Sequence, residues 1–258
     1  MEPKKILKLT SDFYKANMKR NTDSELYDYV VNKRKLDFNT RETFGIGISM
    51  DDSGLVRFLE RKGVEHSEMQ ELGLIYEKDN ESRDYMSNRF TIEIRDVFGA
   101  LIGFSGRKIY GGGKYKYLNT KTTPMFAKRK TVFNLDKAKY HIDYLDNPYL
   151  IVVEGYCDVM SLWQHGIKNV VAVMGTACTE YQAKLIRMFC NKVVLCLDGD
   201  GAGQKAMESA EEMLNNHGVE TYKAILTDGK DGDELMQMEN GKELFMSIIN
   251  KALKGETK

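Results

Sequence analysis

The chain has 258 residues, of which 42% are hydrophobic and 29% charged, a composition typical of a soluble globular protein with one or two domains. Its apolar runs are far shorter than the ~20 residues that span a bilayer, and its first residues lack the apolar core of a secretory signal. These features argue against membrane and secreted classes, so we expect a cytoplasmic protein. The four cysteines form no Cys-x-x-Cys pair, which indicates reduced structural thiols and no zinc site.

The formal net charge is zero, but the two halves of the chain differ in sign. Residues 1–146 hold 27 Lys and Arg against 22 Asp and Glu, and residues 147–258 hold 11 against 16. Between Arg107 and Lys139, ten basic side chains accompany a single acid, Asp136. A basic region beside an acidic one suits a polyanion bound across a metal centre. A solvated basic surface is the alternative explanation.

The first half of the chain predicts a mixed α+β region. Apolar residues at helical spacing predict helices over 1–36, 54–62 and 67–72, with a short extended piece at 45–48. From Arg89 onward, apolar and polar residues alternate, and the turn at 96–99 leads back into a second apolar run. This pattern predicts a β-hairpin.

The second half predicts alternating strands and helices. Strands are expected near 149–153, 169–174, 192–197 and 221–226, and helices near 157–165, 179–190 and 202–216. This order is typical of a parallel sheet with helical crossovers, that is, an α/β fold. We therefore expect a basic α+β subdomain over 1–145, an α/β domain over 146–236 and a short helical tail over 237–258.

Acidic residues follow three of the predicted strands. They are Glu154, the pair Asp198 and Asp200, and the pair Asp231 and Asp233. The carboxyl ends of parallel strands form the ligand-binding edge of such a sheet. Two like charges ~4 Å apart repel by roughly 4 kcal/mol at an effective dielectric near 20, and a divalent cation removes that repulsion. All-oxygen clusters favour magnesium or manganese, so the sequence predicts a metal site suited to phosphate chemistry.

Each of these motifs has a simpler explanation when it is taken alone. A glutamate such as Glu154 is often a helix N-terminal acid, and Asp-Gly pairs are common in turns. Asp158, one helical turn after Glu154, is expected to support the ligands rather than bind metal. Cys157, Cys178 and His165 are interpreted as packing residues because no charged partner is evident to activate a thiol.

Together these motifs resemble a known module. Glu-Gly-Tyr-Cys-Asp-Val at 154–159, Gly-Thr at 175–176 and Asp-Gly-Asp-Gly-Ala-Gly at 198–203 are similar to the Rossmann-like Toprim module of DnaG-type primases, topoisomerases and some nucleases. The first half resembles the RNA-polymerase core of bacterial and phage DnaG-type primases through the segments 44–47, 88–96, 102–107, 116–120 and 126–128. The resemblance extends over roughly residues 5–240.

The resemblance implies roles for individual residues. Glu154, Asp198 and Asp200 match the metal-binding catalytic acids of the family, and Asp231 and Asp233 match a further acidic pair. The positions that match nucleotide- or template-handling residues are Arg34, Arg95, Arg107, Lys116, Asn119 and Lys128. The implied cofactors are two or more Mg²⁺ or Mn²⁺ ions.

The chain also departs from the family pattern. Asp231-Gly232-Asp233 stands where the family usually has Asp-Pro-Asp, which predicts a less rigid loop, and Cys157 replaces an apolar residue. Because no zinc ribbon or helicase-binding domain is recognisable, we expect either a compact phage-like primase or a catalytic core. A replicative helicase and a zinc-bearing subunit supplied in trans are candidate partners.

The resemblance implies DNA-dependent synthesis of short RNA primers from ribonucleoside triphosphates on a single-stranded template. Two alternatives remain open at this stage: a Toprim nuclease that uses the same metal site, and a non-catalytic protein that only binds single-stranded DNA. A topoisomerase is disfavoured because the primase-like segment occupies the place of its strand-cleaving domain.

Overall fold

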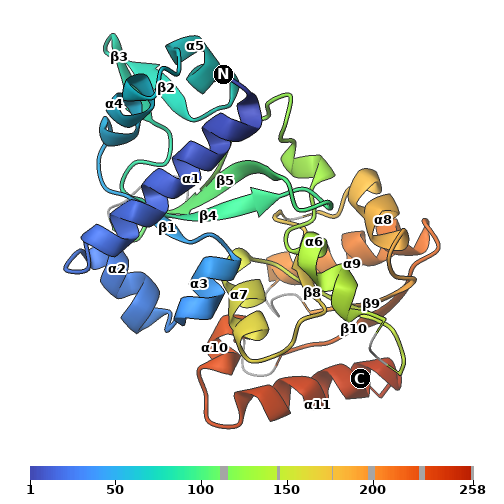
Figure 1. The fold of residues 1–258 in the computed structure, drawn as a ribbon. Coiled ribbons are helices and arrows are strands. Elements are labelled where there is room, and N and C mark those ends of the chain that lie inside the picture. Colours follow the sequence, from blue (N-terminus) through green and yellow to red (C-terminus); the bar gives the residue numbers. More distant parts are fainter. Residues whose placement is uncertain (111–115, 144–145, 176, 197–200, 227–229, 257–258) are drawn as a thin grey trace. The chain divides into compact units, whose positions relative to one another are not determined.

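A computed structural model describes residues 1–110, 116–143, 146–175, 177–196, 201–226 and 230–256. Contacts divide the chain into two compact units. Unit 1 comprises residues 1–95 and 100–128, and unit 2 comprises residues 96–99 and 129–258 (Figure 1). The domain limits expected from the sequence, 1–145, 146–236 and 237–258, stay a prediction.

Unit 1 is a mixed α+β structure, as predicted. Its helices are α1 (Pro3–Arg20), α2 (Glu25–Asp28), the π-helix η1 (Tyr29–Lys33), α3 (Phe38–Thr43), α4 (Gly54–Arg61) and α5 (His66–Glu71). Its strands are β1 (Gly47–Ser49), β2 (Ile75–Lys78), β3 (Glu81–Asp84), β4 (Arg89–Arg95), β5 (Leu101–Arg107) and β6 (Tyr117–Asn119). An antiparallel sheet has the strand order β1-β4-β5-β6, and β2 and β3 pair separately. The predicted hairpin is confirmed as β4 and β5.

Helix α1 packs its apolar face on the sheet of unit 1 (Figure 1). The buried Tyr14 ring meets Phe104 edge-on, with centroids 5.5 Å apart, and its hydroxyl donates to Asp84 Oδ1 at 2.8 Å. Asp84 is 1% exposed and also accepts hydrogen bonds from Ser49 Oγ and the Met86 amide. Burial raises the pKa of Asp84 to about 6, although these hydrogen bonds lower it.

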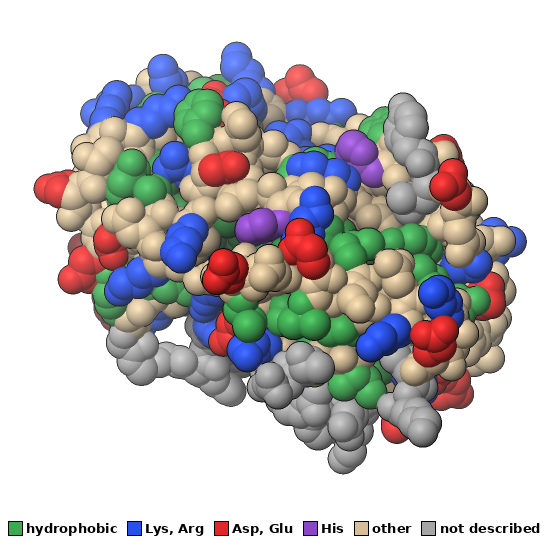
Figure 2. Space-filling model, turned by 90° about the horizontal axis from the view of Figure 1, so that it is seen from below, with side chains coloured by type: hydrophobic (Ala, Val, Ile, Leu, Met, Phe, Trp, Pro, Cys, Tyr) green, Lys and Arg blue, Asp and Glu red, His purple; other side chains and the backbone are tan. Residues whose placement is uncertain are grey.

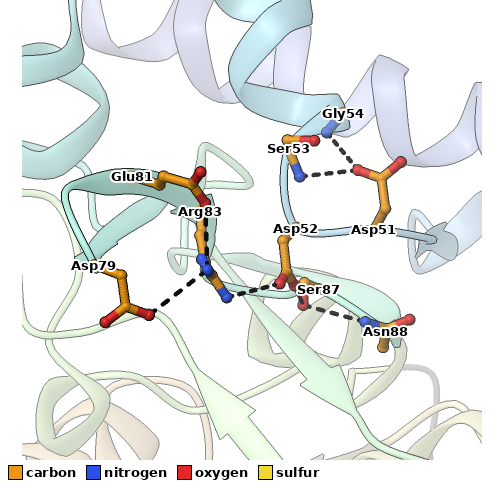
Figure 3. A network of polar contacts seen from close by, with 9 residues as sticks. All are labelled: Asp51, Asp52, Ser53, Gly54, Asp79, Glu81, Arg83, Ser87 and Asn88. Atoms are coloured by element: carbon orange, nitrogen blue, oxygen red, sulfur yellow. Dashed lines mark hydrogen bonds and ion pairs between the residues drawn. The ribbon is translucent and has the colours of Figure 1, made fainter.

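The β2–β3 hairpin was not predicted from the sequence. Its turn residues Asp79 and Asn80 have φ values of 52° and 61°, the left-handed conformation that two-residue hairpin turns require. Figure 3 shows how Arg83 on β3 pairs with Asp79, Glu81 and Asp52. Because Asp52 precedes α4, this network joins the hairpin to the start of that helix.

A second polar network joins α1 to β4. Glu93 is 4% exposed and interacts with Ser11, Lys15 and Arg95. Burial alone would raise the pKa of Glu93, but the Ser11 hydrogen bond and the two cations lower it overall. Gly45, at φ +59°, lies so close that a Cβ there would meet Glu93 Cδ at 2.1 Å, so this position requires glycine.

Unit 2 contains a parallel sheet, which confirms the α/β prediction. Its strands are β7 (Leu150–Val153), β8 (Val170–Ala172), β9 (Lys192–Leu195) and β10 (Glu220–Lys223), in the order β10-β9-β7-β8. Its α-helices are α6 (Leu135–Ala138), α7 (Tyr156–Gln164), α8 (Glu180–Arg187), α9 (Gly201–Asn215), α10 (Gly232–Met236) and α11 (Gly241–Leu253). The 3₁₀ segments are η2 (Lys128–Lys130), which spans the boundary between the units, and η3 (Lys139–His141).

The apolar run at 224–226 predicts a strand buried on both faces, and the structure contradicts this prediction. Among the described strands, β10 pairs with β9 alone, and it exposes Glu220 and Lys223. The apolar residues 224–226 follow the strand, and Ile225 is 52% exposed. An edge strand has one neighbour and retains a solvated side, which accounts for the difference.

Three features of the structure relate to the composition: the apolarity of the helices, the burial of the cysteines and the distribution of surface charge. None of the described helices combines the length and apolarity that crossing a membrane demands. All four cysteines are buried. On the face shown in Figure 2, Lys and Arg side chains are interspersed with Asp and Glu side chains, so this view shows no large patch of one sign.

Candidate functional site

The first candidate residues lie where β7 leads into α7. All four residues of β7 are buried, and the half-buried Glu154 follows immediately. Gly155 is the N-cap of α7, and its amide donates to Asp158 Oδ2 at 3.1 Å. This hydrogen bond satisfies one of the amides at the helix start and fixes the turn that carries Glu154.

Asp158 also contacts the second acidic motif. Its Oδ1 accepts a hydrogen bond from the Asp233 amide at 3.2 Å. A Cβ on Gly232 would lie 3.4 Å from Asp158 Cβ, so the two loops approach closely at this glycine. The carboxylate of Asp158 therefore binds a backbone amide 75 positions away in the sequence.

The Asp231–Asp233 motif begins α10. Asp231 is the N-cap, and its Oδ1 accepts from the Glu234 amide at 2.7 Å. The Asp233 side chain is 1% exposed. Thus Asp231 has a capping role in the structure, and Asp233 is a buried residue whose backbone amide contacts Asp158.

The Asp198–Asp200 motif lies outside the described residues. The preceding strand, β9, is hydrogen-bonded in parallel to β7, with Leu195 opposite Val152. The Cys196 amide donates to Val152 O at 2.9 Å. The carboxyl end of β9 therefore lies beside the carboxyl end of β7, which Glu154 follows. Within the described ranges, no group of three or more His, Cys, Asp or Glu side chains is arranged to hold a metal.

Unit 1 brings two of the predicted basic residues together around one tyrosine ring. The Cζ atoms of Arg34 and Arg107 each lie 5.3 Å from the centroid of the Tyr29 ring. Arg34 Nε donates to the Tyr29 hydroxyl, and Arg107 Nη1 donates to the Tyr117 hydroxyl, both at 2.8 Å. We call these four residues the Arg–Tyr cluster.

The other predicted basic-region residues have different surroundings. Lys116 is exposed, and its carbonyl accepts from the Lys108 amide. Asn119 on β6 is paired with Ser105 on β5. Lys128 is exposed, whereas Arg95 is paired with the buried Glu93. The charge of Arg95 is therefore already compensated inside unit 1.

Sequence reasoning did not identify Tyr29 as a site residue. A signal was present in the run Tyr29–Lys35, in which a tyrosine precedes an arginine by five positions. Residues five apart are brought together by the i to i+5 hydrogen bonds of a π-helix. Apolar periodicity does not predict a π-helix.

Cys178 and two phenylalanines of the basic segment are buried. Burial raises the pKa of Cys178 to about 11, which disfavours its thiolate and agrees with a packing role. Phe126 and Phe133 lie within the basic segment 107–139, where aromatic rings could stack on bases, but they are 1% and 2% exposed and belong to the cores of their units.

Comparisons with known proteins agree with this arrangement. Residues 13–139 match the DNA primase catalytic core, N-terminal domain, and residues 151–236 match the Toprim-like family. The DNA primase of Aquifex aeolicus is 36% identical over 239 residues, which cover 93% of this chain and 47% of that protein. The chain thus spans about half the length of this curated relative.

Solved structures show the same fold. A DNA primase domain from Pseudomonas aeruginosa superposes with a TM-score of 0.86 at 31% identity, covering 97% of this chain and 78% of that one. The DnaG primase catalytic domain bound to ssDNA gives a TM-score of 0.85 at 29% identity, covering 97% and 78%. The chain therefore belongs to the family of DnaG-type primase catalytic cores, in which a primase N-terminal domain is joined to a Toprim domain.

Proposed function

We propose that this chain catalyses DNA-dependent synthesis of short RNA primers from ribonucleoside triphosphates. The observation that carries the proposal is the hydrogen-bonded link between the Glu154 and Asp233 motifs through Asp158, in a chain that has both domains of the primase core. Its partners would be a single-stranded DNA template, which the related catalytic domain binds, and ribonucleoside triphosphates. The activity would take place in the cytoplasm of a bacterial or phage-infected cell.

The acidic residues fit Mg²⁺ or Mn²⁺ by their chemistry. Glu154, Asp198, Asp200, Asp231 and Asp233 offer only carboxylate oxygens, the donors that these ions prefer, and no Cys or His belongs to the set. When bound, divalent ions lower the pKa of an attacking hydroxyl and neutralise the leaving pyrophosphate.

The protein's own contribution would be positioning and charge compensation. Asp158 orients the backbone of the Glu154 and Asp233 motifs by accepting from the Gly155 and Asp233 amides. Arg34 and Arg107 are fixed cations that could bind phosphate oxygens. The reaction would be attack of a primer 3′-hydroxyl on the α-phosphorus of the incoming nucleotide, with pyrophosphate leaving.

A replicative helicase and a zinc-bearing subunit are further proposed partners, as the resemblance to DnaG-type primases implies. Adding either protein to the primer-synthesis assay would test them. An increase in initiation frequency at unchanged elongation would support such a partner.

One assay distinguishes the proposal from its alternatives. Labelled ribonucleotides, magnesium and mixed-sequence single-stranded DNA are incubated with the chain, and the products are separated by size. Ladders of short RNA support primer synthesis, nicked DNA in the absence of ribonucleotides indicates a nuclease, and salt-sensitive binding without products indicates a binding protein. The variant Asp198→Ala should abolish the ladder, and Asp143→Ala, at an exposed acid, should retain it.

A further inference from the structure

We propose that Tyr29 is a positioning residue that holds Arg34 and Arg107 as one phosphate-binding unit. The inference rests on the proposed function and extends it to a residue with no assigned role. Both guanidinium groups lie 5.3 Å from the same ring centroid, within the range of cation–π attraction. A single side chain therefore contacts both cations.

The π-helix makes this contact possible. In an α-helix, residues five apart are rotated by about 140° around the axis and do not face each other. Here the Arg34 amide donates to Tyr29 O at 2.8 Å, an i to i+5 bond, and this wider turn aligns the two side chains. Arg34 Nε can then reach the Tyr29 hydroxyl at 2.8 Å.

Residues distant in the sequence hold the ring from other directions. Tyr29 stacks on Phe90 of β4, with centroids 5.8 Å apart and planes at 28°. Arg107 reaches the ring from the end of β5, where it is 7% exposed, and Tyr117 of β6 accepts its Nη1 hydrogen. The sheet thus fixes Arg107, and Tyr29, by contacting both arginines, positions Arg34 relative to Arg107.

A double-mutant cycle tests this coupling. Tyr29→Leu, Arg107→Gln and the double variant are compared for binding of a fluorescein-labelled oligo(dT), for binding of ATP and for primer synthesis. We expect Tyr29→Leu and Arg107→Gln each to weaken binding of at least one of these ligands about tenfold. The double variant should lose no more than about twofold beyond Arg107→Gln alone, because the two residues act as one unit.

Conservative variants and a matched control separate positioning from folding. Tyr29→Phe keeps the ring but loses the hydroxyl, so it should reproduce Arg34→Gln and retain most of the Arg107 contribution. Tyr27→Leu, at a half-buried tyrosine two residues away, should change binding less than twofold. Loss of oligo(dT) binding in Tyr29→Leu should also reduce its salt dependence, as loss of a phosphate contact does.

The outcomes separate this inference from the proposed function. Additive losses in the cycle, or wild-type binding by Tyr29→Leu, would overturn the role of Tyr29. If the wild-type chain binds oligo(dT) or ATP but makes no primers, the proposed function fails, and the cycle scored on binding still decides the inference. A wild-type chain that binds neither ligand overturns both.

Discussion

The two units place their candidate functional residues in different ways. In unit 2, Glu154 directly follows the buried parallel strand β7, and the Asp231–Asp233 motif begins helix α10, which follows strand β10. In unit 1, Arg34 and Arg107 meet around Tyr29 although Arg34 is the C-cap of a π-helix and Arg107 ends a β-strand. Glu154 is positioned by the end of a sheet strand, whereas the Arg–Tyr cluster forms only when η1, β5 and β6 pack together.

This comparison predicts different consequences of substitution. Substitution of the half-buried Glu154 in unit 2 should affect chemistry with little effect on folding, because this residue lies at a strand end. Buried polar groups in unit 1, such as Asp84 and Glu93, should affect stability and its pH dependence.

The largest expected effect is that of Glu154→Gln. The substitution keeps the shape of the side chain but removes its charge, so we expect primer synthesis to fall about 1000-fold, since metal-assisted charge stabilisation is worth several kcal/mol. Thermal unfolding should change by no more than about 0.5 kcal/mol, as for other partly exposed positions. The exposed Glu239 provides the control, Glu239→Gln. A variant that retains a tenth of wild-type activity would contradict the assigned role.

The second prediction concerns the stability of unit 1 and Asp84. Burial raises its folded pKa to about 6, above the ordinary value of 3.8, so the folded state retains a proton that the unfolded state has released. Stability from this group is therefore full below about pH 4 and is lost as the pH rises through 6, by up to about 3 kcal/mol.

Asp84→Asn mimics the protonated form and should remove this loss. Urea unfolding of both proteins at pH 4.5, 5.5 and 7, followed by circular dichroism, measures the difference. The stability of the variant relative to wild type should increase across this series. A difference that stays constant with pH would refute the assignment.

The third prediction concerns the link within unit 2. Asp158→Asn keeps the size of the side chain but replaces one acceptor oxygen by a donor, so it cannot accept from both Gly155 and Asp233. Residues that orient metal ligands typically contribute 10- to 100-fold, and we expect a loss of about 30-fold in kcat. The magnesium concentration for half-maximal activity should rise in parallel. A loss of activity without any change in magnesium dependence would indicate a purely structural role.

The smallest expected effect is that of Lys116→Ala. Lys116 is exposed, so its removal should leave unfolding unchanged while KM for the nucleotide rises about fivefold, since a charge-assisted contact is lost. Lys62→Ala, at another exposed lysine in unit 1, is the matched control. An unchanged KM together with an unchanged rate would remove Lys116 from the site.

The sequence determined much of unit 2 because its signals are local. Continuous apolar runs predicted β7, β8 and β9 within two residues, and the acids were found from their position after the strands. It also determined the β4–β5 hairpin through strict alternation. It did not reveal that β10 is an edge strand, because the number of neighbours of a strand is a property of the sheet.

Tertiary structure alone decided the rest. The hairpin β2–β3 carries a turn signal in Asp79-Asn80, but its strands lack alternation because Glu81 and Arg83 belong to a polar network, in which Arg83 pairs with Asp52. The link from Asp158 to Asp233 and the meeting of Arg34 with Arg107 join residues more than 70 positions apart. Local patterns encode burial and turns, whereas such pairs form only when separate elements pack, and for that reason only the folded chain shows them.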